Sequence, residues 1–225
     1  MSENIIQLEN VSVAFDGEKV LDNLSLSIKD KEFVTLLGPS GCGKTTTLRI
    51  IAGFIEPDSG NLYFDGKRIN DIPPYKRQVN TVFQRYALFP HLNVFENIAF
   101  GLRLKKMPDA EIRKKVFDML ELVNLKGYAS RKVGNLSGGQ QQRVAIARAV
   151  AAKPVIILAD EPTGNLDSAT SHEVLGLLKM AARQFSQTII LITHDRDIAQ
   201  LADRIVHIED GKIVGNTGKG SELHA

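Results

Sequence analysis

Apolar and polar residues alternate along much of the first thirty positions of the chain. The segments IIQLENVSVAF and KVLDNLSLSI both show a period of two, with a turn that begins DG between them. This period is typical of half-buried β-strands, so the pattern predicts two strands of an antiparallel layer. The later segment GNLYFDGKRI, with DG near its centre, predicts another hairpin.

Short, continuous apolar runs indicate buried strands in the rest of the chain. EFVTLLG is followed by the helical pattern KTTTLRIIAGF, and VIILAD is followed by a helical pattern over residues 168–183. QTIILIT, a short helix, RIVHIE and GKIVGN complete the series. Strands that alternate with helices in this way predict a parallel sheet and an α/β fold.

Between residues 86 and 153 the apolar period becomes that of a helix. The segment DAEIRKKVFDMLELVN places Ile112, Val116, Leu120 and Val123 on one face, with charged residues opposite. We therefore predict one domain over residues 1–225, with an inserted α-helical subdomain. The predicted core is 1–85 and 154–225, and the predicted subdomain is 86–153.

Composition narrows the class of protein further. The chain has 225 residues, 43% of them hydrophobic, and its net charge of +2 argues against a nucleic-acid binder. Its longest apolar runs fall far short of the roughly 20 residues that span a bilayer, and MSENIIQLEN is unlike a signal peptide. With Cys42 as its one cysteine, the chain is expected to stay in the cytoplasm.

The segment GPSGCGKT matches the phosphate-binding P-loop pattern G-x-x-x-x-G-K-[ST] between a predicted strand and a predicted helix. Glycines let the backbone wrap phosphate groups, the lysine neutralises the β- and γ-phosphates, and the hydroxyl after it binds Mg²⁺. The predicted nucleotide-binding residues here are Gly38, Pro39, Ser40, Gly41, Cys42, Gly43, Lys44, Thr45 and Thr46.

Further polar residues follow predicted strands. Asp160 and Glu161 end VIILAD, His194 follows TIILIT, and Gln84 follows NTVF. Parallel sheets bind ligands at this edge, so Asp160 is expected to hold Mg²⁺ and Glu161 to polarise the water that attacks the γ-phosphate. His194 would contact the γ-phosphate, and Gln84 would reach the metal or the water.

The segment NLSGGQ opens a helix in an unusual way. Ser137 is a good N-cap, but Gly138 and Gly139 each cost roughly 1 kcal/mol relative to alanine inside a helix. Two glycines expose the first backbone N–H groups where the helix dipole is positive. The segment is therefore predicted to meet an anion.

GPSGCGKTT, Gln84, LSGGQ, LADEPT, NLD and His194, in this order and across nearly the whole chain, resemble the ATP-binding cassette (ABC) ATPases of membrane transporters. The resemblance implies a P-loop ATPase that uses ATP and Mg²⁺. In that family two cassettes pair head to tail, and the LSGGQ signature of one contacts the γ-phosphate of ATP held by the other. The partners implied are a second, similar cassette and separate membrane subunits, with the chain peripheral at the cytoplasmic face.

The resemblance also assigns roles to individual positions. Phe15 matches the aromatic residue that stacks on adenine, Gln84 the loop that couples to the membrane subunit, and Asp167 the loop that crosses the dimer. His194 matches the switch histidine. The residues expected to face the nucleotide of the second cassette are Ser137, Gly138, Gly139 and Gln140.

Two segments point to different subgroups. ADEPTGNLDSATS and LITHDRDIAQLADRIVHIEDGKIVG resemble the group of macrolide exporters, lipoprotein-releasing ATPases and antimicrobial-peptide resistance transporters. TVFQRYALFPHLNVFENIAFGL resembles importers of polyamines, sugars or iron. We give the first more weight and expect export or mechanical work, with solute import as the alternative. A soluble cassette outside transport and a scaffold that does not hydrolyse ATP are less favoured.

Overall fold

The computed structural model describes residues 3–218 and divides them into two compact units. The first unit holds residues 3–79 and 188–218, and the second holds residues 80–187. These units are defined by contacts between residues, and their boundaries differ from those of the predicted core, 1–85 and 154–225, and the predicted helical subdomain, 86–153. A division by contacts does not test a division by function, so the core and the subdomain stay predictions.

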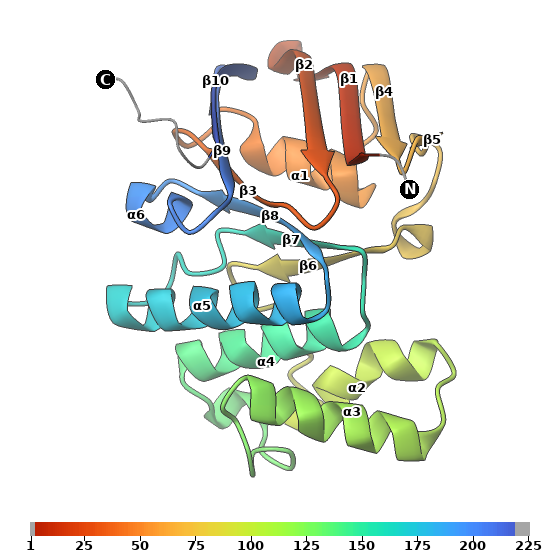
Figure 1. Cartoon of the computed structure of the whole chain (residues 1–225), viewed down its shortest axis with the longest axis vertical. Coiled ribbons are helices and arrows are strands. Elements are labelled where there is room, and N and C mark those ends of the chain that lie inside the picture. Colours follow the sequence, from red (N-terminus) through yellow and green to blue (C-terminus); the bar gives the residue numbers. More distant parts are fainter. Residues whose placement is uncertain (1–2, 219–225) are drawn as a thin grey trace. The chain divides into compact units, whose positions relative to one another are not determined.

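The first unit contains an antiparallel sheet with the strand order β2-β1-β4-β5 (Figure 1). Its strands are β1 (Asn4–Phe15), β2 (Glu18–Lys29), β4 (Ser59–Phe64) and β5 (Lys67–Arg68). The pairs Asp16-Gly17 and Asp65-Gly66 join neighbouring strands, and all four residues have positive φ. Two-residue type I′ hairpin turns require this conformation, which explains the DG dipeptides of the sequence.

The first unit also contains four strands of a second sheet, in the order β10-β9-β3-β8. These elements are β3 (Phe33–Leu37), β8 (Thr188–Thr193), β9 (Arg204–Glu209) and β10 (Lys212–Gly218), with helices α1 (Lys44–Ala52), α6 (Arg196–Ala199) and the 3₁₀ turn η1 (Pro74–Lys76). Strand β3 is parallel to both β8 and β9. All residues of β3 and β8 are buried, as is typical of parallel strands covered on both faces.

The prediction that β10 continues the parallel series is wrong. Strand β10 pairs antiparallel to β9, because only Asp210 and Gly211 connect them and both have positive φ. Parallel neighbours need a crossover of a dozen or more residues, whereas a two-residue turn allows only a hairpin.

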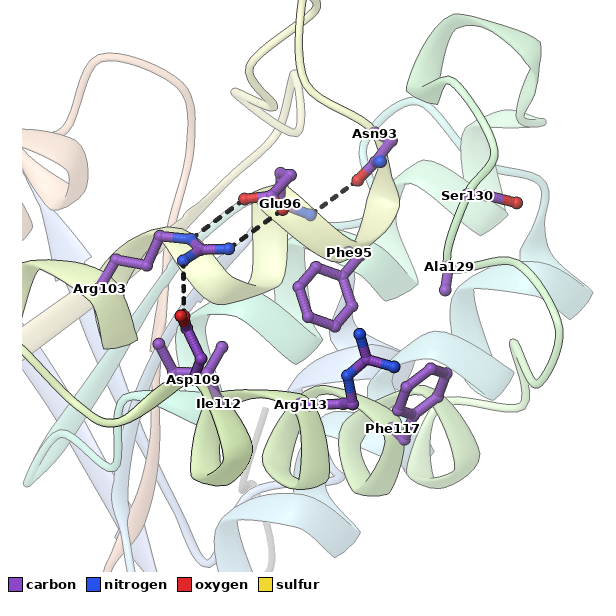
Figure 2. Close-up of a pocket in the computed structure, with 10 residues that line it drawn as sticks. All are labelled: Asn93, Phe95, Glu96, Arg103, Asp109, Ile112, Arg113, Phe117, Ala129 and Ser130. Carbon is purple, nitrogen blue, oxygen red and sulfur yellow. Dashed lines mark hydrogen bonds and ion pairs between the residues drawn. The ribbon is translucent and has the colours of Figure 1, made fainter.

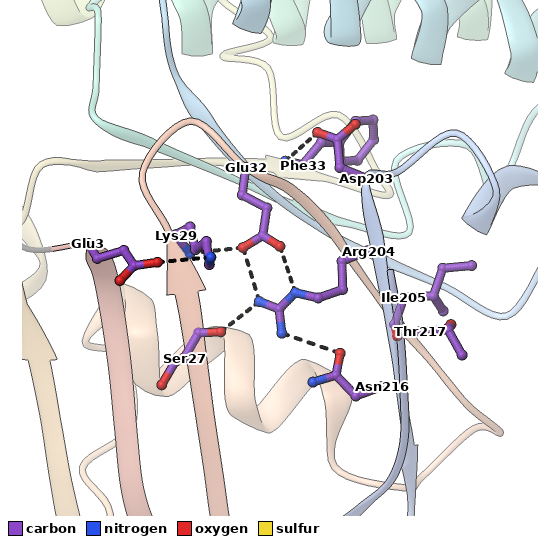
Figure 3. A network of polar contacts seen from close by, with 10 residues as sticks. All are labelled: Glu3, Ser27, Lys29, Glu32, Phe33, Asp203, Arg204, Ile205, Asn216 and Thr217. Atoms are coloured by element: carbon purple, nitrogen blue, oxygen red, sulfur yellow. Dashed lines mark hydrogen bonds and ion pairs between the residues drawn. The ribbon is translucent and has the colours of Figure 1, made fainter. Parts of the chain in front are cut away.

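A polar network joins three strands of the first unit (Figure 3). Arg204 of β9 forms two hydrogen bonds with the carboxylate of Glu32, from Nε to Oε1 at 2.6 Å and from Nη2 to Oε2 at 3.0 Å. The same Nη2 donates to the carbonyl oxygen of Ser27 in β2, at 2.6 Å. Because Glu32 directly precedes β3, the guanidinium fixes the turn that leads into the P-loop strand.

The second unit combines two strands with four α-helices. They are β6 (Val79–Phe83), which begins at the unit boundary, β7 (Ile156–Asp160), α2 (Val94–Leu104), α3 (Asp109–Leu122), η2 (Val133–Asn135), α4 (Gly138–Ala151) and α5 (Ser168–Gln184). Helix α4 packs against α2, α3 and α5. The four predicted core positions of α3 and its end, Ile112, Val116, Leu120 and Val123, are buried, which confirms the helical pattern.

No helix within residues 3–218 is both long and apolar enough to span a bilayer.

Candidate nucleotide site

The P-loop of the first unit connects β3 to α1, as its sequence predicts. Gly41 and Gly43 adopt φ values of 83° and 99°, which side-chain-bearing residues rarely reach. A Cβ atom on Gly38 would collide with the carbonyl oxygen of Ile208 and lie 2.9 Å from the Sγ atom of Cys42. The glycines therefore shape a loop that a larger residue could not form.

Lys44, the first residue of α1, is 5% exposed and folds back over this loop. Its Nζ donates to the carbonyl oxygens of Gly38 and Pro39, at 2.8 and 2.6 Å, and lies 3.5 Å from the Sγ atom of Cys42. All three contacts within the described part of the chain are with neutral groups. A buried ammonium in a glycine-lined cradle at a helix N-terminus suits a phosphate group.

His194 and Phe15 lie elsewhere in the first unit. Leu37 pairs with Thr193 at the ends of β3 and β8, so the P-loop and His194 leave the same edge of the sheet. Phe15 ends β1 and is 46% exposed, so its ring is outside the core and available for stacking.

The first unit contains one positioning side chain that sequence patterns missed. Arg77 donates to the carbonyl oxygens of Ile50 and Ile51, at 2.7 and 2.9 Å, where α1 ends. It also donates to the carbonyl oxygens of Ile69 and Ile72 in the following segment. Burial lowers the pKa of this guanidinium, and the charge of Glu56 opposes that effect. Arg77 therefore fixes the far end of the P-loop helix.

In the second unit, Asp160 is the last residue of β7 and Glu161 follows it. Glu161 has a φ of 44°, a left-handed conformation that costs of order 1–3 kcal/mol for a residue of this type. The Nε2 of Gln142, a buried residue of α4, donates a short hydrogen bond to the carbonyl oxygen of Pro162. A left-handed backbone at a residue such as Glu161 is found most often at functional sites.

Gln84 lies against the loop that follows Glu161. A Cβ atom on Gly164 would come within 2.5 Å of the Nε2 atom of Gln84. The Nδ2 atom of Asn165 donates to the carbonyl oxygen of Gln84, at 3.2 Å. The second unit therefore brings Gln84 and the loop after Glu161 together.

The signature segment begins α4 with a reciprocal capping box. Ser137 Oγ accepts from the backbone N–H of Gln140, whose side-chain oxygen accepts from the N–H of Ser137. A Cβ atom on Gly138 would lie 2.7 Å from the Tyr86 hydroxyl, and one on Gly139 would lie 2.6 Å from Cγ2 of Thr170. Close packing against Tyr86 and Thr170 is thus a second reason for glycine at positions 138 and 139, besides the exposure of backbone N–H groups.

A pocket of about 380 Å³ opens beside this helix end. Its lining includes the four signature residues, together with Arg143, Asn165, Leu166, Asp167 and Thr170. Arg143 Nη2 forms an ion pair with Glu173 Oε2 at 2.6 Å. The pocket therefore holds the N–H groups of Gly138 and Gly139 at the positive end of the helix dipole, next to Arg143, which is paired with Glu173, and the carboxylate of Asp167.

Asp167 caps α5 in the wall of that pocket. Its carboxylate accepts from the backbone N–H of Thr170 at 3.0 Å and from the Thr170 hydroxyl at 2.7 Å. The backbone hydrogen bond, followed by the hydroxyl bond, lowers the pKa of Asp167. The second unit thus places Asp167 next to the signature residues.

A second set of side chains missed from sequence surrounds residues 86–93. Arg148 of α4 donates to the carbonyl oxygens of Ala87 and Tyr86, and burial lowers the pKa of its guanidinium. The buried Nδ2 of Asn97 donates to the carbonyl oxygens of Phe89, Leu92 and Asn93. The sequence offered one indication of this role, because Arg148 is the single charged residue of the apolar stretch VAIARAV.

Another pocket, of about 480 Å³, lies between α2, α3 and residues 129–130 (Figure 2). Arg103 bridges Glu96 and Asp109 at its edge, with contacts of 3.2 and 3.0 Å. The rings of Phe95 and Phe117 line it, with centroids 6.1 Å apart. It contains none of the predicted site residues.

The candidate site residues therefore fall into two groups, one in each unit. The P-loop, Phe15 and His194 belong to the first unit, while Gln84, Asp160, Glu161, Asp167 and the signature segment belong to the second.

A protein-family model described as ABC transporter matches residues 21–164, more than half of the chain. The chain belongs to the ABC transporter family.

A curated ABC relative, the spermidine/putrescine import ATP-binding protein PotA of Clostridium novyi (strain NT), is 54% identical over 214 residues. The match covers 95% of this chain and 62% of that protein, so the chain spans less than two thirds of the relative's length.

Among solved structures, the dimeric bacterial ABC transporter cassette MJ0796 is 37% identical, with a TM-score of 0.86 and coverage of 96% of this chain and 100% of that one. A dimeric post-hydrolysis state of MJ0796, bound to ADP and Pi, is 36% identical, with a TM-score of 0.85 and the same coverage. The predicted fold and the predicted class, an ATP-binding ATPase domain of the ABC type, are confirmed.

The predicted subgroup within the ABC family is wrong. We expected the macrolide-export and lipoprotein-release group, acting in export or mechanical work. The curated relatives at 49–55% identity are named as polyamine import proteins instead. The segment after Gln84, which resembled importers, was the better guide.

Proposed function

We propose that this chain is the ATP-binding part of an ABC importer and that the imported solute is a polyamine of the spermidine or putrescine class. The observation that carries the proposal is 54% identity to a PotA protein along 95% of the chain. The match covers 214 of the 225 residues, so it extends well beyond the nucleotide motifs. The P-loop geometry of the first unit supplies the chemical basis.

For the first unit, we assign the phosphate groups of ATP to Lys44 and to the backbone N–H groups of residues 40–46. The buried Lys44 ammonium, with its neutral partners, supports this role. Thr45 is assigned as a ligand of Mg²⁺, His194 as a contact of the γ-phosphate, and the exposed Phe15 as the residue that stacks on adenine. A bound Mg²⁺ would supply positive charge that stabilises the phosphate groups during hydrolysis.

For the second unit, we assign Asp160 and Gln84 as oxygen donors toward Mg²⁺ and Glu161 as the group that polarises the attacking water. The left-handed backbone of Glu161 and the packing of Gln84 against Gly164 support a preorganised arrangement. Hydrolysis requires that Glu161 accept a hydrogen bond from the water and later a proton.

The signature pocket is assigned to the nucleotide held by a second copy of the chain. The backbone N–H groups of Gly138 and Gly139, between the two capped N–H groups of Ser137 and Gln140, and the guanidinium of Arg143, which also pairs with Glu173, support an anion site without a phosphate-binding loop of their own. Asp167 would face the second copy across the same interface. Separate membrane subunits would carry the solute, with the chain bound to them at the side of the membrane where ATP is present.

The proposal is tested by measuring the uptake of radiolabelled putrescine and spermidine in cells whose own copy of the chain carries Glu161→Gln. Uptake should fall at least about tenfold, because the loss of a positioned general base slows hydrolysis by this much or more. Uptake of labelled proline serves as the control and should not change. Polyamine uptake equal to that of the parent cells would reject the proposed function.

A further inference from the structure

The segment that follows Gln84 is attached to the signature helix at two separate points of α4. At the first point, Arg148 Nη1 donates to the carbonyl oxygen of Ala87 at 2.8 Å, and Nη2 donates to that of Tyr86 at 3.3 Å. The guanidinium carbon also lies 5.5 Å from the centre of the Phe89 ring. These contacts hold Tyr86 and Ala87 in consecutive left-handed conformations, with φ values of 60° and 47°.

The second point is the N-terminus of the same helix. The hydroxyl of Tyr86 lies so close to Gly138 that a Cβ atom there would be 2.7 Å from it. Gly138 and Arg148 are ten residues apart, which is about 15 Å along a helix axis. Contacts at both positions constrain the direction of the helix as well as its location.

We propose that Tyr86 and Arg148 form a clasp that makes residues 85–89 and α4 move as one body. Both are positioning residues: Arg148 fixes the loop after Gln84, and the Tyr86 side chain sets where the signature N–H groups point. This inference depends on the proposed function in one respect, because those N–H groups are assigned to the nucleotide of a second copy. A displacement of the loop by a bound membrane subunit would then reorient the signature segment directly.

The test uses Arg148→Met, which removes the guanidinium, and Tyr86→Phe, which removes only the hydroxyl. Arg113→Met, on the exposed face of α3, and Tyr75→Phe, 83% exposed in the first unit, are the matched controls. The first readout is amide hydrogen exchange of the chain without nucleotide. In Arg148→Met, residues 85–89 and 138–146 should exchange about tenfold faster, as expected for a lost charged hydrogen bond.

The second readout is ATP-dependent dimerisation, measured by sedimentation. All variants are made in a parent protein that carries Glu161→Gln, so that ATP hydrolysis does not dissociate the dimer. Each clasp variant should raise the dissociation constant of the dimer about tenfold while ATP affinity of the monomer stays within about twofold, because the P-loop is untouched. The two controls should match the parent in both measurements.

An unchanged dimer constant in both clasp variants, when the parent dimerises, would overturn the inference, even if exchange at 85–89 rose. If the parent failed to dimerise, that result would count against the proposed function instead. Exchange at 138–146 would then decide: acceleration would support the clasp and no change would overturn it. Tyr86→Phe keeps the test valid should Arg148→Met fail to fold.

Discussion

Buried and half-buried cations of this chain donate hydrogen bonds to backbone carbonyl groups close to the predicted site. Lys44 contacts the P-loop itself, Arg77 contacts the end of α1, and Arg148 contacts the loop after Gln84. Carbonyl groups compensate a buried charge only in part, which is why the pKa values of both arginines are lowered by burial. At the level of single residues, cations fix the backbone on which the site is built.

We expect Arg77→Met to lower the free energy of unfolding by about 2–4 kcal/mol, because five carbonyl groups lose a charged donor. Urea unfolding measures the change. The control is Arg49→Met, at an exposed arginine of α1, the helix whose end Arg77 contacts; this substitution should cost less than about 1 kcal/mol. Equal effects of the two substitutions would contradict the role given to Arg77.

Site residues that lie close together in the sequence could be predicted from it, whereas residues that meet only in the folded chain could not. The P-loop residues lie within nine consecutive positions and share one motif, so their arrangement follows from the sequence. Arg148 and its partner Ala87 are 61 residues apart, and Arg77 and Ile50 are 27 apart. Contacts of that kind form only when the elements pack, and a single sequence holds no pattern that predicts them.

At the level of elements, turn chemistry and helix capping define most boundaries. The DG pairs at residues 16–17 and 65–66 mark hairpins in the sequence and in the structure, and the same dipeptide at 210–211 reverses β10. The parallel interpretation of β10 ignored this signal. Ser137 caps α4 as predicted, whereas the packing of Gly138 against Tyr86 could not be predicted from local sequence.

The cap of α5 predicts a pH dependence. Hydrogen bonds from Thr170 lower the pKa of Asp167 below its ordinary value of 3.8, so the ionised cap stabilises the fold above that pH. The contribution is lost as the pH falls through the lowered pKa. In thermal unfolding, Asp167→Asn should therefore lower the melting temperature slightly at pH 7, and the difference between the two proteins should shrink as the pH is lowered progressively below 3.8. A gap between the two proteins that stayed constant or widened at low pH would contradict this account.

At the level of the whole molecule, the segment that resembled exporters and the segment that resembled importers lie in regions whose sequences are restricted by different interactions. The GNLD segment lies beside Glu161 and the signature pocket, where the chemistry of ATP restricts the residues that any cassette uses. The segment after Gln84 contains exposed side chains that nucleotide chemistry does not restrict. Surface segments of this kind vary with the binding partner, so they carry more information about the transported solute.

The most direct test of polyamine import is the direction of transport in reconstituted vesicles. The chain is purified with the membrane subunits that we propose for it, together with any solute-binding protein that accompanies them, and ATP is supplied only on the side that carries the chain. We predict that labelled putrescine accumulates on that same side when ATP is present, and that Glu161→Gln abolishes the accumulation. Movement of putrescine away from the ATP-bearing side, or no ATP-dependent movement while ATP is hydrolysed, would contradict it.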